Sequence, residues 1–434
     1  MSSSAIRRTF IQTVSSQSGN TVLLRGWVFH LRHLSKTAFV VLRDCSGTVQ
    51  CVVAATRLKG VAIKLDDAVE IEGLVHADAR AQGGVEVHVT RLTVLNAASN
   101  KLPFNASTDL SSVGIEARLE YRPLAVRNPT VGTVFKIQAA ILRLFREFLT
   151  ANRFTEIVTS KLLSSGTEGG TQLFEVAYFD RVAYLAQSPQ FYKEHGVAAF
   201  ERVFETGHVY RAEPHASSRH LTEYCSLDLE LGFIESPEEV IELERALLSH
   251  MFERLNAEFG DYLTGLGVPL LPSMQAAPVW EFEECLELLR EEYGPHHLAA
   301  DLDPEAERRL CALAEKRSGV PAVFVLGFPL PSRPFYTAPR GESGASQGFD
   351  LLFRGVEITS GGQRLHGREA LEQGLRQRGV DVESFENHLR MFDLGMPPHG
   401  GLAIGLERLT ALIVGLQNVR DAVLYPRDRY RLSP

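Results

Sequence analysis

The chain has 434 residues, of which 44% are hydrophobic, and its formal net charge at pH 7 is −8. This length predicts two or three domains with large cores, and the acidic balance argues against indiscriminate binding to polyanions. No run of about 18 apolar residues occurs, and the N-terminus MSSSAIRRTF lacks the apolar region of a signal peptide, so we expect a cytoplasmic protein without a membrane partner. The five cysteines form no CxxC pair, which argues against a disulfide framework and a zinc site.

Residues 20 to 95 have the pattern of five short strands, separated by Ser-Gly, Lys-Gly and Gln-Gly-Gly turns. Five such strands predict a small barrel of the OB type. The first 100 residues carry eleven Lys and Arg against seven Asp and Glu, although the chain as a whole is acidic. This basic end is therefore the better candidate for contact with nucleic acid.

Residues 101 to 130 are irregular and predict a connector between the barrel, residues 1 to 100, and a second domain, residues 131 to 434. The second domain should open with a helix, because apolar residues recur at helical spacing from Val134 to Phe148. A short strand is predicted at 154 to 160. The apolar face of this helix could pack within its own monomer or against a second copy of the chain.

The stretch from Arg202 to Phe233 predicts a long antiparallel hairpin, broken by a polar loop at residues 214 to 218. Its second strand alternates apolar and polar residues, which is the pattern of a half-buried strand. The polar face carries several charges, and unpaired charges are costly on a packed sheet, so a ligand is one explanation for them. An ordinary solvated sheet face is the other. These charged residues are Arg211, Glu213, Arg219, Asp228 and Glu230.

Four further segments have recognisable patterns. Residues 164 to 193 contain a Gly-rich turn, suited to a lid, and then two strands. Residues 236 to 328 are mostly helical with alternating charges, which we interpret as an insertion packed on a sheet and without chemistry of its own. Residues 349 to 364 (FDLLFRGVEITSGGQR) carry several charged and polar residues, and residues 401 to 409 (GLAIGLERL) run into an apolar helix.

The hairpin, residues 349 to 364 and residues 401 to 409 resemble signature segments of class II aminoacyl-tRNA synthetases of the aspartyl, asparaginyl and lysyl group, and the resemblance runs nearly end to end. It implies an α+β fold, in which an N-terminal OB-fold β-barrel binds the anticodon and a class II catalytic domain is built on an antiparallel sheet flanked by helices. The compact archaeal type is implied, since the large bacterial insertion has no room. Residues 134 to 160 resemble the segment that forms the homodimer interface, although Ser160 replaces the usual proline.

The resemblance implies that the chain activates L-aspartate with ATP and transfers it to the 3′ end of tRNA(Asp). Such chemistry depends on positioning and charge neutralisation, for which Arg211 and Arg408 are the implied catalytic residues. The implied ATP site consists of Arg211, Ala212, Glu213, Arg219, His220, Leu221, Glu357, Gly405, Leu406, Glu407 and Arg408.

A substrate with a side-chain carboxylate calls for a fixed arginine, and Arg364 with Lys193 fits that role. The implied aspartate site consists of Glu168 on the lid, Gln190, Phe191, Tyr192, Lys193, Arg211, Asp228, Ser360 and Arg364.

By the same resemblance, Glu357, Ser360 and Asp350 hold Mg²⁺, which prefers hard oxygen ligands. Asp350 and Glu357 are seven residues apart and would face opposite sides of an unbroken strand. We therefore expect a bend at Arg354 and Gly355.

The resemblance also implies that Phe39 stacks on an anticodon base, with Arg32 and Gln50 beside it. Phe39 by itself would more simply be a core residue. At Gln82, relatives that discriminate between tRNAs tend to carry lysine and relaxed ones proline, so this chain matches neither. A neutral side chain favours relaxed choice, in which tRNA(Asn) is charged as well and an amidotransferase partner completes the product.

Two alternatives stay open. One is an asparaginyl-tRNA synthetase, and the other is a non-catalytic paralogue that binds RNA. The complete set of ATP residues argues against the paralogue, because a binding module has no need of it.

Overall fold

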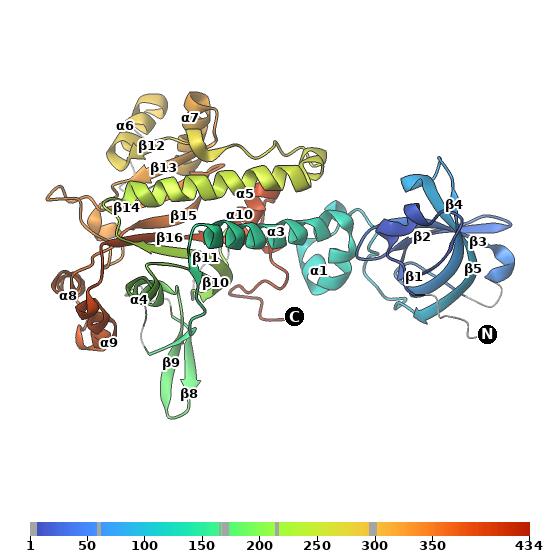
Figure 1. Cartoon of the computed structure of the whole chain (residues 1–434), viewed down its shortest axis with the longest axis horizontal. Helices are drawn as coiled ribbons and strands as arrows, with labels where there is room; N and C mark the ends of the chain where they lie inside the picture. Colours follow the sequence, from blue (N-terminus) through green and yellow to red (C-terminus); the bar gives the residue numbers. More distant parts are fainter. Residues whose placement is uncertain (1–6, 59–61, 165, 167–172, 213–216, 295–301) are drawn as a thin grey trace. The chain divides into compact units, whose positions relative to one another are not determined.

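The structure is a computed structural model that describes the chain except for residues 1–6, 59–61, 165, 167–172, 213–216 and 295–301 (Figure 1). The chain divides into two compact units, Met1–Gly132 and Thr133–Pro434. In the part that the structure describes, no helix is long and apolar enough to cross a membrane.

The first unit contains a closed five-stranded barrel with the strand order β1-β2-β3-β5-β4, which confirms the predicted OB architecture (Figure 1). Alternate residues point inward, as in β2, where Ala38, Val40 and Leu42 are buried. The strands are β1 (Thr21–His33), β2 (Thr37–Arg43), β3 (Thr48–Ala54), β4 (Ala68–Ala77) and β5 (Val85–Asn96). Short 3-10 turns are η1 (Ile11–Gln17), η2 (Ala55–Arg57) and η3 (Gln82–Gly84).

The segment after the barrel has a small core of its own, which includes Phe104, Leu110 and Leu124. Its elements are η4 (Leu110–Ser112), α1 (Ile115–Glu120) and α2 (Arg122–Arg127). The helix expected from Val134 begins earlier, as α3 (Pro129–Ala151), so the first unit ends inside its first turns.

The second unit is organised on an eight-stranded sheet with the order β12-β13-β14-β15-β16-β11-β10-β6 (Figure 1). All neighbours are antiparallel except β12–β13 and β6–β10. The strands are β6 (Thr155–Glu156), β10 (Arg202–Tyr210), β11 (Glu223–Gly232), β12 (Val279–Glu281), β13 (Ala322–Leu326), β14 (Gly348–Phe353), β15 (Val356–Gln363) and β16 (His399–Gly405).

Helices α3 and α5 (Pro237–Gly265) pack on this sheet and share one apolar core with it, which confirms the expected flanking helices (Figure 1). Helices α6 (Phe282–Tyr293) and α7 (Pro304–Ser318) form a second core with β12 and β13. The interpretation of residues 236 to 328 as an added insertion is therefore wrong, since β12 and β13 are strands of the central sheet. A run of five apolar residues, AVFVL, gives no sequence signal that separates a buried strand from a helix.

A small sheet, β7-β9-β8, and two helical groups complete the second unit, with the β8–β9 hairpin projecting from it (Figure 1). Helix α4 packs in a separate core with the segment around α8 and α9. These elements are β7 (Leu162–Leu163), β8 (Glu175–Tyr178), β9 (Arg181–Leu185), α4 (Gln190–Phe200), α8 (Arg368–Gln377), η8 (Glu383–Phe385), α9 (Glu386–Leu389) and η9 (Arg390–Leu394). The remaining elements are η5 (Met274–Ala276), η7 (Leu330–Ser332), α10 (Leu406–Val414) and η10 (Val419–Ala422).

The predicted hairpin is present as β10 and β11, but β11 is not half-buried. Its apolar residues from Leu227 to Leu231 lie in the core, and Asp228 and Glu230 on the opposite face are 1% and 0% exposed. Both faces are covered because α4 supplies a partner for each carboxylate through Lys193. Alternation of residue type therefore identified the strand and its two faces but not its burial.

Residues 349 to 364 form two strands and not one bent strand. Arg354 and Gly355 both have positive φ, 49° and 81°, as a tight two-residue hairpin turn between β14 and β15 requires. This turn makes Asp350 and Ser360 cross-strand partners.

Candidate active site

A cavity of about 300 Å³ opens on the second unit where β11, β15 and β16 meet the first turn of α10. Nine of the predicted site residues line it, from three segments that are far apart in the sequence. They are Arg211, Arg219, His220, Leu221, Glu357, Ser360, Gly405, Glu407 and Arg408.

Arginines approach this cavity from different elements. Arg211 directly follows β10, and Arg408 is in the first turn of α10, where its Nη1 donates to the Glu357 carbonyl oxygen at 2.7 Å. Arg219 lies 3.4 Å from the Glu307 carboxylate on α7. Burial raises the pKa of Glu307, although Arg219 opposes the shift. Glu307 belongs to the segment to which we assigned no chemistry, and nothing in its helical charge pattern distinguishes it.

Glu407 has a different role from the arginines. Both of its carboxylate oxygens accept from the Cys225 backbone N–H at 3.1 Å, so the side chain ties α10 to β11. Burial raises its pKa to about 7. Leu406 is buried in the apolar core and Ala212 is half-buried, while Glu213 and Glu168 lie outside the described residues.

The predicted metal residues come together across the β14–β15 hairpin. A register shift between Leu351 and Leu352 re-phases the pairing, so that Leu352 faces Glu357 while Asp350 faces Ser360. Both Asp350 oxygens accept from Arg333, at 2.8 and 2.6 Å, and Arg333 also reaches Ser360 Oγ at 3.3 Å. Partial burial, together with the negative charge of Asp350, raises the pKa of Glu357 to about 7.

These donors suit a cation that brings other ligands with it. Among the described residues, no group of three or more His, Cys, Asp and Glu side chains could hold a metal ion without help. Glu357 and Ser360 at the cavity wall, with Asp350 opposite Ser360 on β14, nevertheless fit Mg²⁺, which keeps part of its coordination for waters and phosphate oxygens.

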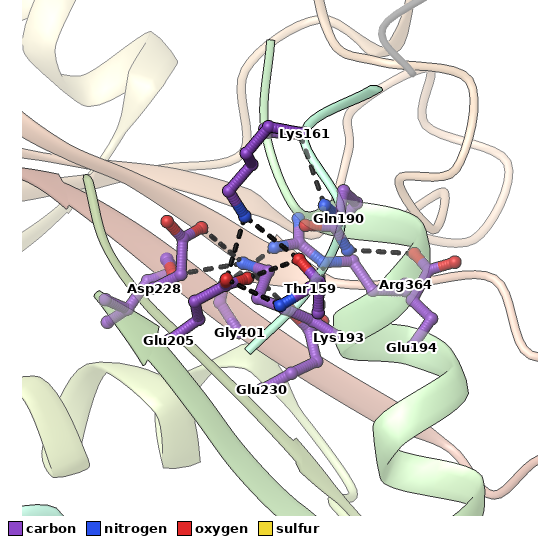
Figure 2. Close-up of polar contacts among 12 residues, drawn as sticks. Thr159, Lys161, Gln190, Lys193, Glu194, Glu205, Asp228, Glu230, Arg364 and Gly401 are labelled. Carbon is purple, nitrogen blue, oxygen red and sulfur yellow. Dashed lines mark hydrogen bonds and ion pairs between the residues drawn. The ribbon is translucent and has the colours of Figure 1, made fainter. Parts of the chain in front are cut away.

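A buried cluster of charges lies beside this cavity, between α4, β11 and β15 (Figure 2). Lys193 Nζ is 3.0 Å from Asp228 Oδ1 and 3.3 Å from Glu230 Oε2. Arg364 Nε is 2.9 Å from Glu230 Oε1, and its Nη2 donates to the Gly401 carbonyl oxygen at 3.0 Å. Burial acts to lower the pKa of Arg364, but the charge of Glu230 outweighs it and raises that pKa. Two cations and two carboxylates are thus paired away from water.

Gly401 makes this arrangement possible. A Cβ at that position would lie 2.2 Å from Glu230 Oε2 and 2.2 Å from the Leu229 carbonyl oxygen, so only glycine lets β16 approach β11 this closely. From the sequence, Glu230 could be identified only as one of the charged residues on the hairpin's polar face. Its alternation with apolar residues places it on that face but does not indicate its buried ion pairs.

The structure separates the predicted α4 residues into two groups. Gln190 and Lys193 are buried near the cluster, at 3% and 1% exposed. Phe191 and Tyr192 instead line a second cavity, of about 320 Å³, with His195 and His388. The predicted aspartate site is therefore not one continuous lining in this structure.

A second carboxylate anchor, which the sequence did not indicate, lies on β10 next to the cluster (Figure 2). Glu205 pairs with Lys161 Nζ at 2.8 Å, and accepts from Thr159 N at 3.0 Å and Thr159 Oγ1 at 2.7 Å. Since Glu205 faces Asp228 across the hairpin, it connects the β6–β7 segment to the same polar face.

The predicted anticodon residues share the outer face of the barrel. Arg32 is paired with Phe39 across β1 and β2, and Phe39 is half-buried while its neighbours Ala38 and Val40 are buried. Gln50 Nε2 donates to Glu86 Oε2 at 3.0 Å, which orients its amide from β5. Gln82 is in η3, and its side chain lies outside the described residues.

Comparison with known proteins agrees with both units. Residues 22–95 match the OB-fold nucleic acid binding domain, and residues 114–429 match the tRNA synthetases class II (D, K and N). The Aspartate--tRNA(Asp/Asn) ligase of Thermus thermophilus is 43% identical and covers 98% of this chain and 100% of its own length. That of Deinococcus radiodurans is 44% identical, with 99% and 100% covered.

A solved structure with the same fold is the asparaginyl-tRNA synthetase of Pyrococcus horikoshii complexed with asparaginyl-adenylate. It is 29% identical with a TM-score of 0.89, and the match covers 99% of this chain and 100% of that one. With the barrel, the catalytic sheet and the arginine-lined cavity in place, the chain belongs to the class II tRNA synthetases of the D, K and N group.

Proposed function

We propose that this chain is an aspartate–tRNA ligase, which converts L-aspartate and ATP to aspartyl-adenylate and pyrophosphate and then transfers the aspartyl group to tRNA. The observation that supports this proposal is that two buried cations, Arg364 and Lys193, lie close together, because two fixed cations suit a substrate with a side-chain carboxylate. The names of the Thermus and Deinococcus relatives support it.

In the first step, the α-carboxylate of aspartate attacks the α-phosphorus of ATP and pyrophosphate leaves. Arg211 and Arg408 neutralise the phosphate charge from two sides of the cavity, so that the anionic nucleophile can approach. Arg219 stands at the same wall and is held there by Glu307. Asp228 is placed to accept from the substrate ammonium group, next to Lys193.

Glu357 and Ser360 would hold Mg²⁺, with Asp350 behind them in its pair with Arg333. When bound, the ion would neutralise phosphate charge and orient the leaving pyrophosphate. Burial and the charge of Asp350 raise the pKa of Glu357, and a bound cation would oppose that shift.

In the second step, the 3′-terminal ribose hydroxyl of the tRNA attacks the aspartyl carbonyl carbon and AMP leaves. The outer barrel face with Arg32, Phe39 and Gln50 is the proposed anticodon contact. We propose that tRNA(Asn) is charged as well as tRNA(Asp), which would require an amidotransferase partner. The Asp/Asn names of two relatives support this choice.

A homodimer belongs to the same proposal. The apolar face of α3 packs on the sheet of its own unit, so the candidate contact is the segment after β6, where Val158 is 93% exposed.

Pyrophosphate exchange with each of two amino acids tests the amino-acid assignment. We expect exchange that depends on aspartate and is at least a hundredfold weaker with asparagine, since a neutral amide offers no charge to Arg364 and Lys193 and places its own NH₂ donor beside them. Preferred use of asparagine would favour an asparaginyl-tRNA synthetase. The similarity to the Pyrococcus horikoshii asparaginyl-tRNA synthetase, with a TM-score of 0.89, makes this the first alternative to test. Exchange with neither amino acid would favour a non-catalytic RNA-binding protein.

A further inference from the structure

A buried chain of polar side chains runs from Gln190, in the proposed amino-acid site, through α4 to α9. Gln190 Nε2 donates to Glu194 Oε1 at 2.9 Å, a bond that Figure 2 shows along α4. Glu194 Oε2 lies 3.2 Å from His388 Nε2, and His388 Nδ1 lies 2.9 Å from His195 Nε2. Gln190, Glu194 and His388 are at most 4% exposed. Buried polar groups this close must agree on which of them donates.

The charge of Glu194 decides how the Gln190 amide is turned. Burial acts to raise the pKa of Glu194, but the hydrogen bond and charge of His388 outweigh it and lower that pKa to about 2. An ionised carboxylate only accepts hydrogen bonds, so the amide nitrogen of Gln190 must face it. The carbonyl oxygen of the planar amide is then directed away from Glu194.

His388 holds Glu194 in this state from the other side. Its ring stacks on Phe191 with centroids 3.9 Å apart, which fixes its plane. Burial, and the charge of His388, lower the pKa of His195 to about 4, so His195 is neutral and can accept from His388 Nδ1. His388 thus contacts Glu194 through Nε2 and His195 through Nδ1.

The other charged groups around this chain leave that direction unchanged. Lys193 on α4 and Arg364 after β15 lie on the pocket side and are paired with Asp228 and Glu230 on β11. His399 on β16 faces Glu194 and also favours its ionised form.

We propose that Glu194 and His388 are positioning residues for amino-acid binding, which hold the Gln190 amide in one orientation so that its carbonyl oxygen accepts from the ammonium group of the substrate. The inference rests on the proposed function, because Gln190 belongs to the aspartate site that the family resemblance implies. An ammonium group only donates, so a flipped amide would turn its NH₂ group toward another donor. A residue that prevents the flip contributes to affinity without touching the substrate.

Glu194→Gln tests the inference in the full-length protein by aspartate- and ATP-dependent pyrophosphate exchange. A glutamine at this position keeps the shape but can donate or accept, so it no longer fixes the orientation of Gln190. We expect the KM for aspartate to rise about tenfold to a hundredfold while the KM for ATP stays within about twofold. Glu201→Gln is the matched control, since it makes the same change at the exposed end of α4 and should alter neither constant.

A double-mutant cycle with Gln190→Ala separates positioning from general damage. If Glu194 acts through Gln190, Glu194→Gln adds almost nothing in the Gln190→Ala background. Full additivity, or an equal rise in both KM values, would overturn the inference. Should Glu194→Gln fail to fold, His388→Gln gives the same test, with a smaller expected rise of about threefold to tenfold and the same requirement of non-additivity.

Failure of the proposed function would look different in these assays. A wild-type protein without aspartate-dependent exchange contradicts the proposed function, and the inference falls with it. An active wild type with an additive cycle contradicts the inference alone.

Discussion

Arg211 and Arg408 approach one cavity from the end of β10 and the first turn of α10, and each should act on phosphate charge. We expect Arg211→Ala and Arg408→Ala to lower the rate of pyrophosphate exchange by about 10²-fold or more, the scale of one lost transition-state donor. Arg376→Ala, at an exposed ion pair on α8, is the control and should leave exchange unchanged. Thermal melting checks that the fold survives, and near-normal exchange by either site variant would remove that arginine from the mechanism.

Glu244 is a buried acid on the core side of the active-site sheet. It is 0% exposed, accepts from Thr359 Oγ1 at 2.5 Å, and burial raises its pKa to about 8 from 4.5. Between these two pH values the folded chain keeps a proton that the unfolded chain releases. Its contribution to stability is therefore fully present below pH 4.5 and is lost as the pH rises through about 8.

Glu244→Gln should remove this dependence on pH. Relative to wild type, the free energy of unfolding of the variant should rise across the window from pH 5 to pH 8, with a gain on the order of 3 kcal/mol near pH 7. Urea unfolding at several pH values measures it, with Glu253→Gln on the exposed side of α5 as the control. Parallel pH curves for wild type and Glu244→Gln would show that the buried acid is ionised.

At the scale of elements, the strand β13 shows that residues 236 to 328, although mainly helical, contribute strands to the catalytic sheet. All five of its residues are buried, and it pairs with β12 on one side and β14 on the other. We expect Phe324→Ala to cost about 3–5 kcal/mol of unfolding free energy in a single transition. Val182→Ala, at a 50% exposed position on β9, should cost far less. A separate early transition for Phe324→Ala would mean that this segment folds independently.

Sequence-based predictions were correct for strands whose residue types alternate. They missed features that depend on contacts between residues far apart in the sequence. The five barrel strands and the β10–β11 hairpin follow from period-2 patterns and turn residues. The turn at Arg354 and Gly355 was only expected as a bend, because a non-glycine residue with positive φ has no reliable sequence signal. Glu194 and His388 meet across almost 200 residues, a contact that no local pattern contains.

At the scale of the whole molecule, the barrel and the catalytic sheet have separate cores, so changes in one should leave the chemistry of the other intact. Phe39→Ala should raise the KM for tRNA about tenfold or more in aminoacylation, on the scale of one lost base stack, while exchange without tRNA stays unchanged. Phe10→Ala, another partly exposed aromatic of the first unit, is the control. Unaltered charging by Phe39→Ala would place the anticodon elsewhere.

The paired charges of the proposed amino-acid site constrain how this enzyme can diverge. Replacing Arg364 alone with a neutral residue would leave Glu230 as a buried carboxylate with one partner fewer. A lineage that alters the recognised side chain must therefore change at least two of these positions together. Substitutions at Arg364 and Glu230 should therefore covary among related proteins. A replacement at only one of the two positions would destabilise the site before it could change the recognised amino acid.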